Sequence, residues 1–112
     1  MFAMLMGLKG IAPRDLHGRM GQDAVTVVDV NARHSWLQAR VPGALNLAPD
    51  FDGTSLPADR AMPLVFYCSN PLCRKAPNAA RKAERLGYTD VRVMSAGISG
   101  WVGAKLPVDS GE

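Results

Sequence analysis

The sequence lacks the features that would assign it quickly to several large functional classes. Its 112 residues contain no apolar run near the roughly 20 residues that a membrane-spanning helix needs. The net charge is only +3 and aromatic residues make up 6%, which is little basic charge and little aromatic surface for a nucleic-acid-binding protein. We therefore expect neither a membrane nor a nucleic acid as a partner.

Cysteine is also scarce, because the chain contains only Cys68 and Cys73. The apolar N-terminus, MFAMLMGL, lacks the basic start and the small-residue cleavage site of a signal peptide. Two cysteines without a secretion signal indicate reactive thiols in a reducing compartment rather than a disulfide scaffold. We predict a cytoplasmic protein whose N-terminal stretch forms a first strand or an apolar extension.

The residues that are present suffice for one folded domain over residues 1–112, since 47% are apolar and 21% are charged. Strand-like and helical patterns alternate along this chain, which predicts an α/β fold with a mostly parallel sheet covered by helices on both faces. The expected strands are 25–30, 44–47, 64–67 and 91–94, the expected helices are 13–17, 32–39 and 76–86, and a short closing element begins at Gly100. Gly18 and Gly21 are predicted to end the first helix, and residues 95–97 to form a loop.

The most informative stretch joins a strand to a helix through a cysteine. Leu64–Tyr67 is a short apolar run typical of a strand that is buried on both faces. Cys68 follows at once, and residues 69–71 favour a turn. Small apolar residues then recur at helical spacing over residues 76–86, and Gly87 is predicted to end this helix. The thiol therefore lies between a buried strand and a helix N-terminus.

Ligands in parallel sheets bind outside the carboxyl ends of strands, and Asp29, Cys68 and Ser95 all lie at such ends. The backbone N–H groups of a loop that enters a helix attract negative charge. Together with Arg74 and Lys75 they would lower the pKa of the cysteine. We predict that Cys68 is a nucleophile with a stabilised thiolate; the alternative is a buried structural cysteine.

Five of the thirteen Lys and Arg residues lie between Arg74 and Arg85. This cluster is either a solvated helix face or a patch that attracts anions.

Cys73 allows three interpretations, because it follows Cys68 with C-x4-C spacing. It is a resolving thiol that forms a disulfide or accepts sulfur, or it fills space under the loop. A zinc site would need His17 and His34 as further ligands, and both are isolated residues on predicted helices. The same isolation argues against cysteine–histidine catalysis, so we expect no metal site.

Five motifs follow one another in a characteristic order and spacing. They are VTVVDVNARHSWLQARVPGALNL at residues 25–47, PLVFYC at Pro63–Cys68, Leu86-Gly87-Tyr88, Val91-Arg92-Val93-Met94, and Ala96-Gly97 with Gly100-Trp101 and Leu106-Pro107-Val108. Over nearly the whole chain this pattern resembles the rhodanese-like domains, and the C-x4-C spacing resembles a subgroup with a longer, two-cysteine active loop. The resemblance implies a single three-layer domain with a five-stranded, mostly parallel sheet.

The resemblance also implies that Cys68 carries sulfur as a persulfide. Sulfane sulfur would pass from a small anionic donor such as thiosulfate to a thiophilic acceptor, for example a thiol or a sulfur-carrier protein. No metal or organic cofactor is implied. The anion-binding loop would comprise Ser69, Asn70, Pro71, Leu72, Cys73, Arg74 and Lys75, with Cys73, Asp29 and Arg40 as auxiliary residues.

The chain departs from the family pattern at three upstream positions. Asn31 stands where the family often has Arg two residues after the strand's Asp. The usual acidic residue of the next helix is replaced around His34 and Ser35, and Ala39-Arg40 replaces Gly-His. These losses keep open a non-catalytic binding module as an alternative.

The end of the active loop is also open to two alignments. Counted back from Gly87-Tyr88, Lys75 takes the place of the residue that closes the loop, which agrees with the two-cysteine subgroup. Counted forward from Cys68, Arg74 completes C-x5-R, the signature of cysteine phosphatases. A phosphatase or an arsenate-reductase-like enzyme using Cys68 and Arg74 is therefore the alternative enzymatic function, although no hydroxyl follows Arg74 to assist the leaving thiolate.

Overall fold

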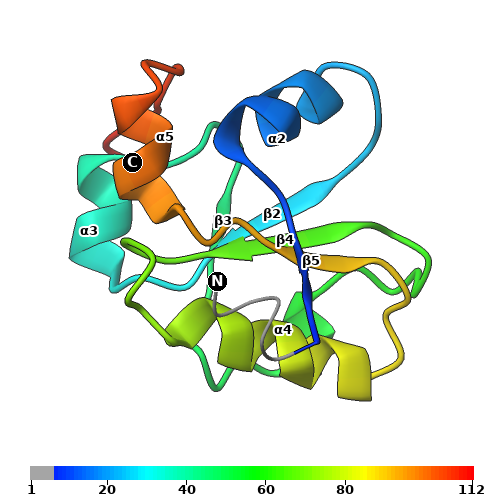
Figure 1. Ribbon diagram of the computed structural model, residues 1–112. Helices are drawn as coiled ribbons and strands as arrows, with labels where there is room; N and C mark the ends of the chain where they lie inside the picture. The colour runs from blue at the N-terminus through cyan, green and yellow to red at the C-terminus, as the bar shows by residue number, and fades with distance from the viewer. Residues whose placement is uncertain (1–6) are drawn as a thin grey trace.

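The computed structural model describes residues 7–112 and shows a parallel sheet between layers of helices (Figure 1). The strand order is β1-β5-β4-β2-β3, and all pairings in this five-stranded sheet are parallel. This confirms the predicted α/β fold. In chain order the elements are β1 (Lys9–Gly10), α2 (Pro13–Met20), β2 (Thr26–Asp29), α3 (Arg33–Gln38), β3 (Leu45–Asn46), a 3-10 turn (Gly53–Ser55), β4 (Leu64–Tyr67), α4 (Lys75–Arg85), β5 (Val91–Val93) and α5 (Gly97–Gly103).

The central strand β4 lies between β2 and β5. Tyr67 pairs with Asp29 of β2, and Phe66 pairs with Val93 of β5. Because these strands run in parallel, their carboxyl ends meet at one edge of the sheet. Residues that follow Asp29, Tyr67 and Val93 therefore lie near one another at this edge.

Side chains of β4 alternate between the two faces of the sheet, as the strand's period requires. Leu64, Phe66 and Cys68 belong to the core shared with α4, whereas Val65 and Tyr67 belong to the core on the opposite face. Figure 1 shows α4 on one face and α2, α3 and α5 on the other, which gives the three predicted layers. The other fully or nearly fully buried members of the second core are Leu16, Val27, Val41, Ala44, Met94 and Trp101.

Helix α4 packs against the sheet through small side chains, which allow the helix to approach the strands closely. Four predicted alanines are buried, but Leu86 is 37% exposed, so the buried stripe ends at Ala83. The helix ends as predicted at Gly87, whose φ is +100°. The Tyr88 N–H donates to the Ala83 carbonyl (3.2 Å) and the Gly87 N–H to the Glu84 carbonyl (3.0 Å), a Schellman motif. The four buried alanines are Ala76, Ala79, Ala80 and Ala83.

Two predicted boundaries are wrong. Gly18 lies inside α2, which continues to Met20 because Met20, like the buried Leu16, packs against the second core; Gly21 is the C-cap, as predicted. The loop after β5 is shorter than expected, since α5 already begins at Gly97. The N-terminal stretch predicted to form a strand or an apolar extension is residues 1–8, of which 1–6 lie outside the described part. Its last residue, Leu8, is buried and directly precedes β1. Within residues 7–112 no helix is both long and apolar enough to cross a membrane.

Candidate active site

The active loop, which we define as residues 68–75, begins directly after β4 and leads into α4. Its first residue, Cys68, is buried with 3% of its surface exposed. The N-terminal turn of α5 holds the loop, because the Ile98 N–H donates to the Cys68 carbonyl (2.9 Å) and the Ser99 N–H to the Ser69 carbonyl (3.0 Å). Gly97 makes this approach possible: its φ is +66°, and a Cβ there would lie 2.5 Å from the Ser69 carbonyl carbon.

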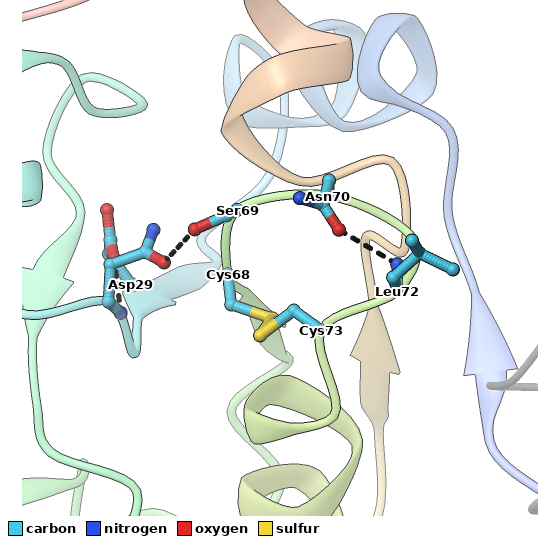
Figure 2. The surroundings of a disulfide bond; sticks show 7 residues. Asp29, Cys68, Ser69, Asn70, Leu72 and Cys73 are labelled. Carbon is cyan, nitrogen blue, oxygen red and sulfur yellow. Dashed lines mark hydrogen bonds between the residues drawn. A yellow bond between two sulfur atoms is a disulfide. The ribbon is translucent and has the colours of Figure 1, made fainter.

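Asn70 shapes the interior of the active loop. Its side-chain Oδ1 accepts a hydrogen bond from the Leu72 N–H (2.9 Å), as Figure 2 shows, and its carbonyl accepts one from the Cys73 N–H (3.1 Å). These two amides were expected to face an anion, but they are used to turn the loop back on itself. In the observed conformation the loop therefore has fewer backbone N–H groups available to bind an anion.

Cys68 and Cys73 are joined by a disulfide bond across the active loop (Figure 2). Their Cα atoms are 6.4 Å apart, within the span of about 4.4–6.8 Å that disulfides bridge. Cys73 is half-buried and also packs against the core beneath α4. The disulfide pairing and the space-filling position, which were alternatives on sequence grounds, are thus found together.

Asn31 connects the end of β2 to the active loop. The Ser69 hydroxyl donates to Asn31 Oδ1 at 2.7 Å, and the Asn31 N–H donates to Asp29 Oδ1 at 2.8 Å. Asn46 Nδ2 donates to the carbonyl of Asn31 (2.9 Å) and to that of Asp29 (3.1 Å), which fixes the segment from β3 as well. The sequence showed Asn31 only as a departure from the family pattern. Its position just past the carboxyl end of β2 was the signal that could have identified it.

Asp29 lies at the predicted edge of the sheet but on the other face from Cys68. Its carboxyl group is fully buried beside Tyr67, and within the described residues Oδ2 has no hydrogen-bond partner. Burial raises the pKa of Asp29, although hydrogen bonds from Tyr67 and Asn31 oppose this effect. Burial, together with the Asp29 charge, also raises the pKa of Tyr67, whose hydroxyl accepts a hydrogen bond from the Val41 N–H (3.0 Å). The link from Asp29 to the active loop therefore runs through Asn31.

Arg40 makes its contacts with α3 and the C-terminal segment. Its guanidinium lies over the Trp36 ring, 3.9 Å from the centroid, and donates to the carbonyls of Gly111 (2.8 Å) and Trp36 (3.2 Å). Such a cation–π contact with two hydrogen bonds holds the C-terminal segment against α3. The auxiliary role of Arg40 at the active loop stays a prediction.

The two histidines lie apart from the cysteines. His17 packs edge-on against Trp101, with ring centroids 5.8 Å apart, and His34 is exposed on α3. Across residues 7–112 no three His, Cys, Asp or Glu side chains gather in a way that could hold a metal ion. The zinc alternative therefore has no ligand set in this part of the chain.

A cavity of about 10 Å³ adjoins the disulfide, roughly enough for one water molecule. Ser95 lines it beside Cys68, so these two of the three predicted strand-end residues do come together. A larger open cavity of about 600 Å³ lies near the start of β2, at the opposite edge of the sheet. The small cavity is also lined by Asn70, Pro71, Cys73, Ala76, Pro77, Val93 and Met94.

Comparison with known proteins agrees with this architecture. The family model of the Rhodanese-like domain matches residues 12–104. The HTH-type transcriptional regulator Rv0324 of Mycobacterium tuberculosis is 35% identical over 104 residues, which cover 90% of this chain and 45% of that protein. The chain thus spans less than half of this relative.

Two solved structures illustrate the range of similar folds. Thiosulfate sulfurtransferase from Pseudomonas aeruginosa is 26% identical with a TM-score of 0.82, covering 93% of this chain and 20% of the other. A protein from Rhodopseudomonas palustris described as a possible tyrosine phosphatase is 22% identical with a TM-score of 0.74, covering 92% of this chain and 86% of the other. The second similarity shows the fold alone.

Proposed function

The chain belongs to the rhodanese-like domain family, and on that premise we propose that it transfers sulfane sulfur through a persulfide on Cys68. The observation that carries the proposal is the position of Cys68 at the carboxyl end of the central strand, in a loop that enters the N-terminus of α4. A helix N-terminus and nearby cations stabilise a thiolate, and Arg74 and Lys75 begin this helix.

The proposed reaction has two steps. The Cys68 thiolate of the reduced protein attacks the outer sulfur of thiosulfate, the S–S bond of the donor breaks, and sulfite leaves with the bonding electrons. A thiophilic acceptor then attacks the outer sulfur of the persulfide and releases the Cys68 thiolate. Each step exchanges one sulfur–sulfur bond for another bond to sulfur, so the cycle needs no separate oxidant or reductant.

We further propose that the acceptor is a protein carrying a thiol. Leu72 stands at the apex of the active loop with 81% of its surface exposed. Beside it, Arg74 and Lys75 add positive charge at the start of α4. An exposed apolar side chain next to cations suits the docking of a protein surface that is partly apolar and partly acidic.

The C-x5-R spacing from Cys68 to Arg74 supports a cysteine phosphatase as the second candidate. Such an enzyme benefits from a hydroxyl near the thiolate, and Ser69 supplies the only hydroxyl of the active loop. That hydroxyl donates to Asn31 Oδ1 at 2.7 Å, and Ala76 follows the loop where a second hydroxyl would be useful. These contacts favour sulfur transfer over phosphate-ester hydrolysis.

The test compares both activities in one protein. Pre-reduced wild-type protein should form thiocyanate from thiosulfate and cyanide, and should not hydrolyse para-nitrophenyl phosphate. Cys68→Ser and Cys68→Ala should both lose thiocyanate formation while keeping the thermal unfolding midpoint close to that of the wild type. Hydrolysis of the phosphate ester without thiocyanate would favour the phosphatase, and a folded wild type with neither activity would favour a non-catalytic binding module.

A further inference from the structure

The fold of the active loop brings Cys73 back to Cys68. Asn70 accepts hydrogen bonds from the backbone N–H groups of both Leu72 (2.9 Å) and Cys73 (3.1 Å), and these turn the chain toward the strand end. The outcome is the Cys68–Cys73 disulfide. Because Cys68 Sγ forms only one bond beyond its Cβ, it can be bonded to a transferred sulfur or to Cys73, but not to both at once.

The disulfide form cannot take sulfur from the proposed donor. The two cysteine sulfurs are bonded to each other, so Cys68 has no thiolate that could attack thiosulfate. The space beside the two cysteines is also narrow, with a cavity of about 10 Å³, roughly one water site. Thiosulfate must therefore react with the reduced loop, and the disulfide is a state reached after that reaction or outside it.

We propose that, when no external acceptor takes the sulfur, Cys73 resolves the Cys68 persulfide and releases hydrosulfide, an activity that rests on the proposed sulfur loading of Cys68. The Cys73 thiolate attacks the inner sulfur, Cys68 Sγ, and the bond between the two persulfide sulfurs breaks. Hydrosulfide leaves with the bonding electrons. The two cysteine sulfurs are oxidised to the disulfide, and the sulfane sulfur is reduced to sulfide. For each thiosulfate, two protein thiols become one disulfide, with sulfite and hydrosulfide as products.

An external dithiol returns the loop to its reduced form. Cys68 is 3% exposed, whereas Cys73 is half-buried, so Cys73 is the more accessible of the two residues and the expected point of attack. Attack at Cys73 makes Cys68 the leaving group, which suits a thiolate stabilised by the start of α4. The reductant of the disulfide form, which is distinct from the sulfur acceptor, is therefore a molecule with two thiols that forms its mixed disulfide with Cys73.

The experiment is a single turnover under anaerobic conditions. The protein is reduced, freed of reductant and mixed with thiosulfate, while sulfite, sulfide and intact mass are followed in time. Free dithiol is left out because it would take sulfur from the persulfide by itself. We expect the wild type to release sulfite and sulfide in equal amounts and to lose two hydrogens. Cys73→Ser and Cys73→Ala should release sulfite, gain one sulfur and release no sulfide.

The other outcomes separate the two proposals. A wild type that releases sulfite but keeps a stable persulfide would overturn the resolving role of Cys73 and leave sulfur loading intact. Movement of the extra sulfur to Cys73, found by peptide mapping, would also overturn it, because attack would then occur at the outer sulfur. If no variant releases sulfite, while the fold is unchanged, sulfur loading itself is contradicted.

Discussion

At the scale of single residues, Asn31 holds the active loop from outside it through a side-chain hydrogen bond with Ser69. Asn31→Ala removes the acceptor of the Ser69 hydroxyl, which lies 2.7 Å from Asn31 Oδ1. A hydrogen bond of this kind contributes about 1 kcal/mol, so we expect about a five-fold loss in kcat/KM for thiosulfate. The matched variant Ser69→Ala should lose a similar amount. Both substitutions remove the same Ser69–Asn31 hydrogen bond, so kcat/KM of the double variant should be little lower than that of either single variant. Additive losses in kcat/KM would show that this hydrogen bond is not the cause.

Asp29 predicts a specific pH dependence of stability. Its pKa in the folded protein is raised above the ordinary 3.8, chiefly by burial, so the folded state holds the proton more tightly than the unfolded chain. The contribution of protonated Asp29 to the stability of the folded protein is fully present below pH 3.8 and is lost as the pH rises through the raised pKa. Asp29→Asn stays neutral throughout. Denaturant unfolding of both proteins across this range should show the variant gaining stability over the wild type as the pH rises, and a constant difference would contradict the assignment.

At the scale of secondary-structure elements, the approach of α5 to the active loop depends on Gly97. A Cβ there would lie 2.5 Å from the Ser69 carbonyl carbon, at a φ of +66°. Gly97→Ala should therefore destabilise the protein by more than about 1 kcal/mol and reduce thiocyanate formation, since α5 must move away from the loop. Gly103→Ala, at the other end of α5, meets no atom within 4 Å and serves as the control. It should be neutral or slightly stabilising, and equal losses in both variants would argue against the close contact.

The cations of α4 lie at different distances from Cys68. Lys75 begins the helix and Arg85 ends it, which places their backbones about 15 Å apart at about 1.5 Å per residue. Screening at physiological salt acts beyond about 8 Å, so only charges near the loop should attract the thiosulfate dianion strongly. We expect Lys75→Ala and Arg74→Ala to lower kcat/KM more than Arg85→Ala, with a smaller difference at high salt. Equal effects of the three substitutions would mean that backbone amides hold the donor.

At the scale of the whole molecule, the sequence predicted local structure better than contacts between distant segments. The apolar run Leu64–Tyr67 and the alanine spacing of α4 identified the central strand and its helix, because strand and helix periods are local properties. The contact between Asn31 and Ser69 spans 38 residues and depends on the strand order, which places β2 beside β4. No local pattern records that order.

The same dependence on distant contacts explains why the positions of Asp29 and Arg40 could not be predicted from the sequence. The alternation of side chains along β2 and β4 places Asp29 on the face opposite Cys68, which becomes evident only once the register Asp29–Tyr67 is known. Arg40 contacts Gly111 near the C-terminus, a partner 71 positions away. By contrast, Cys73 is five residues from Cys68, and its possible pairing was accessible from spacing alone.

The most direct test of the account is the location of the first transferred sulfur. Cys73→Ser protein is suited to it, because the persulfide on Cys68 then has no second protein thiol beside it. The reduced variant is treated with thiosulfate, desalted and analysed by intact mass and peptide mapping, and then treated with cyanide. The account predicts a gain of one sulfur on the peptide containing Cys68, removed by cyanide as thiocyanate. A folded variant that gains no sulfur, or gains it on a peptide without Cys68, would contradict it.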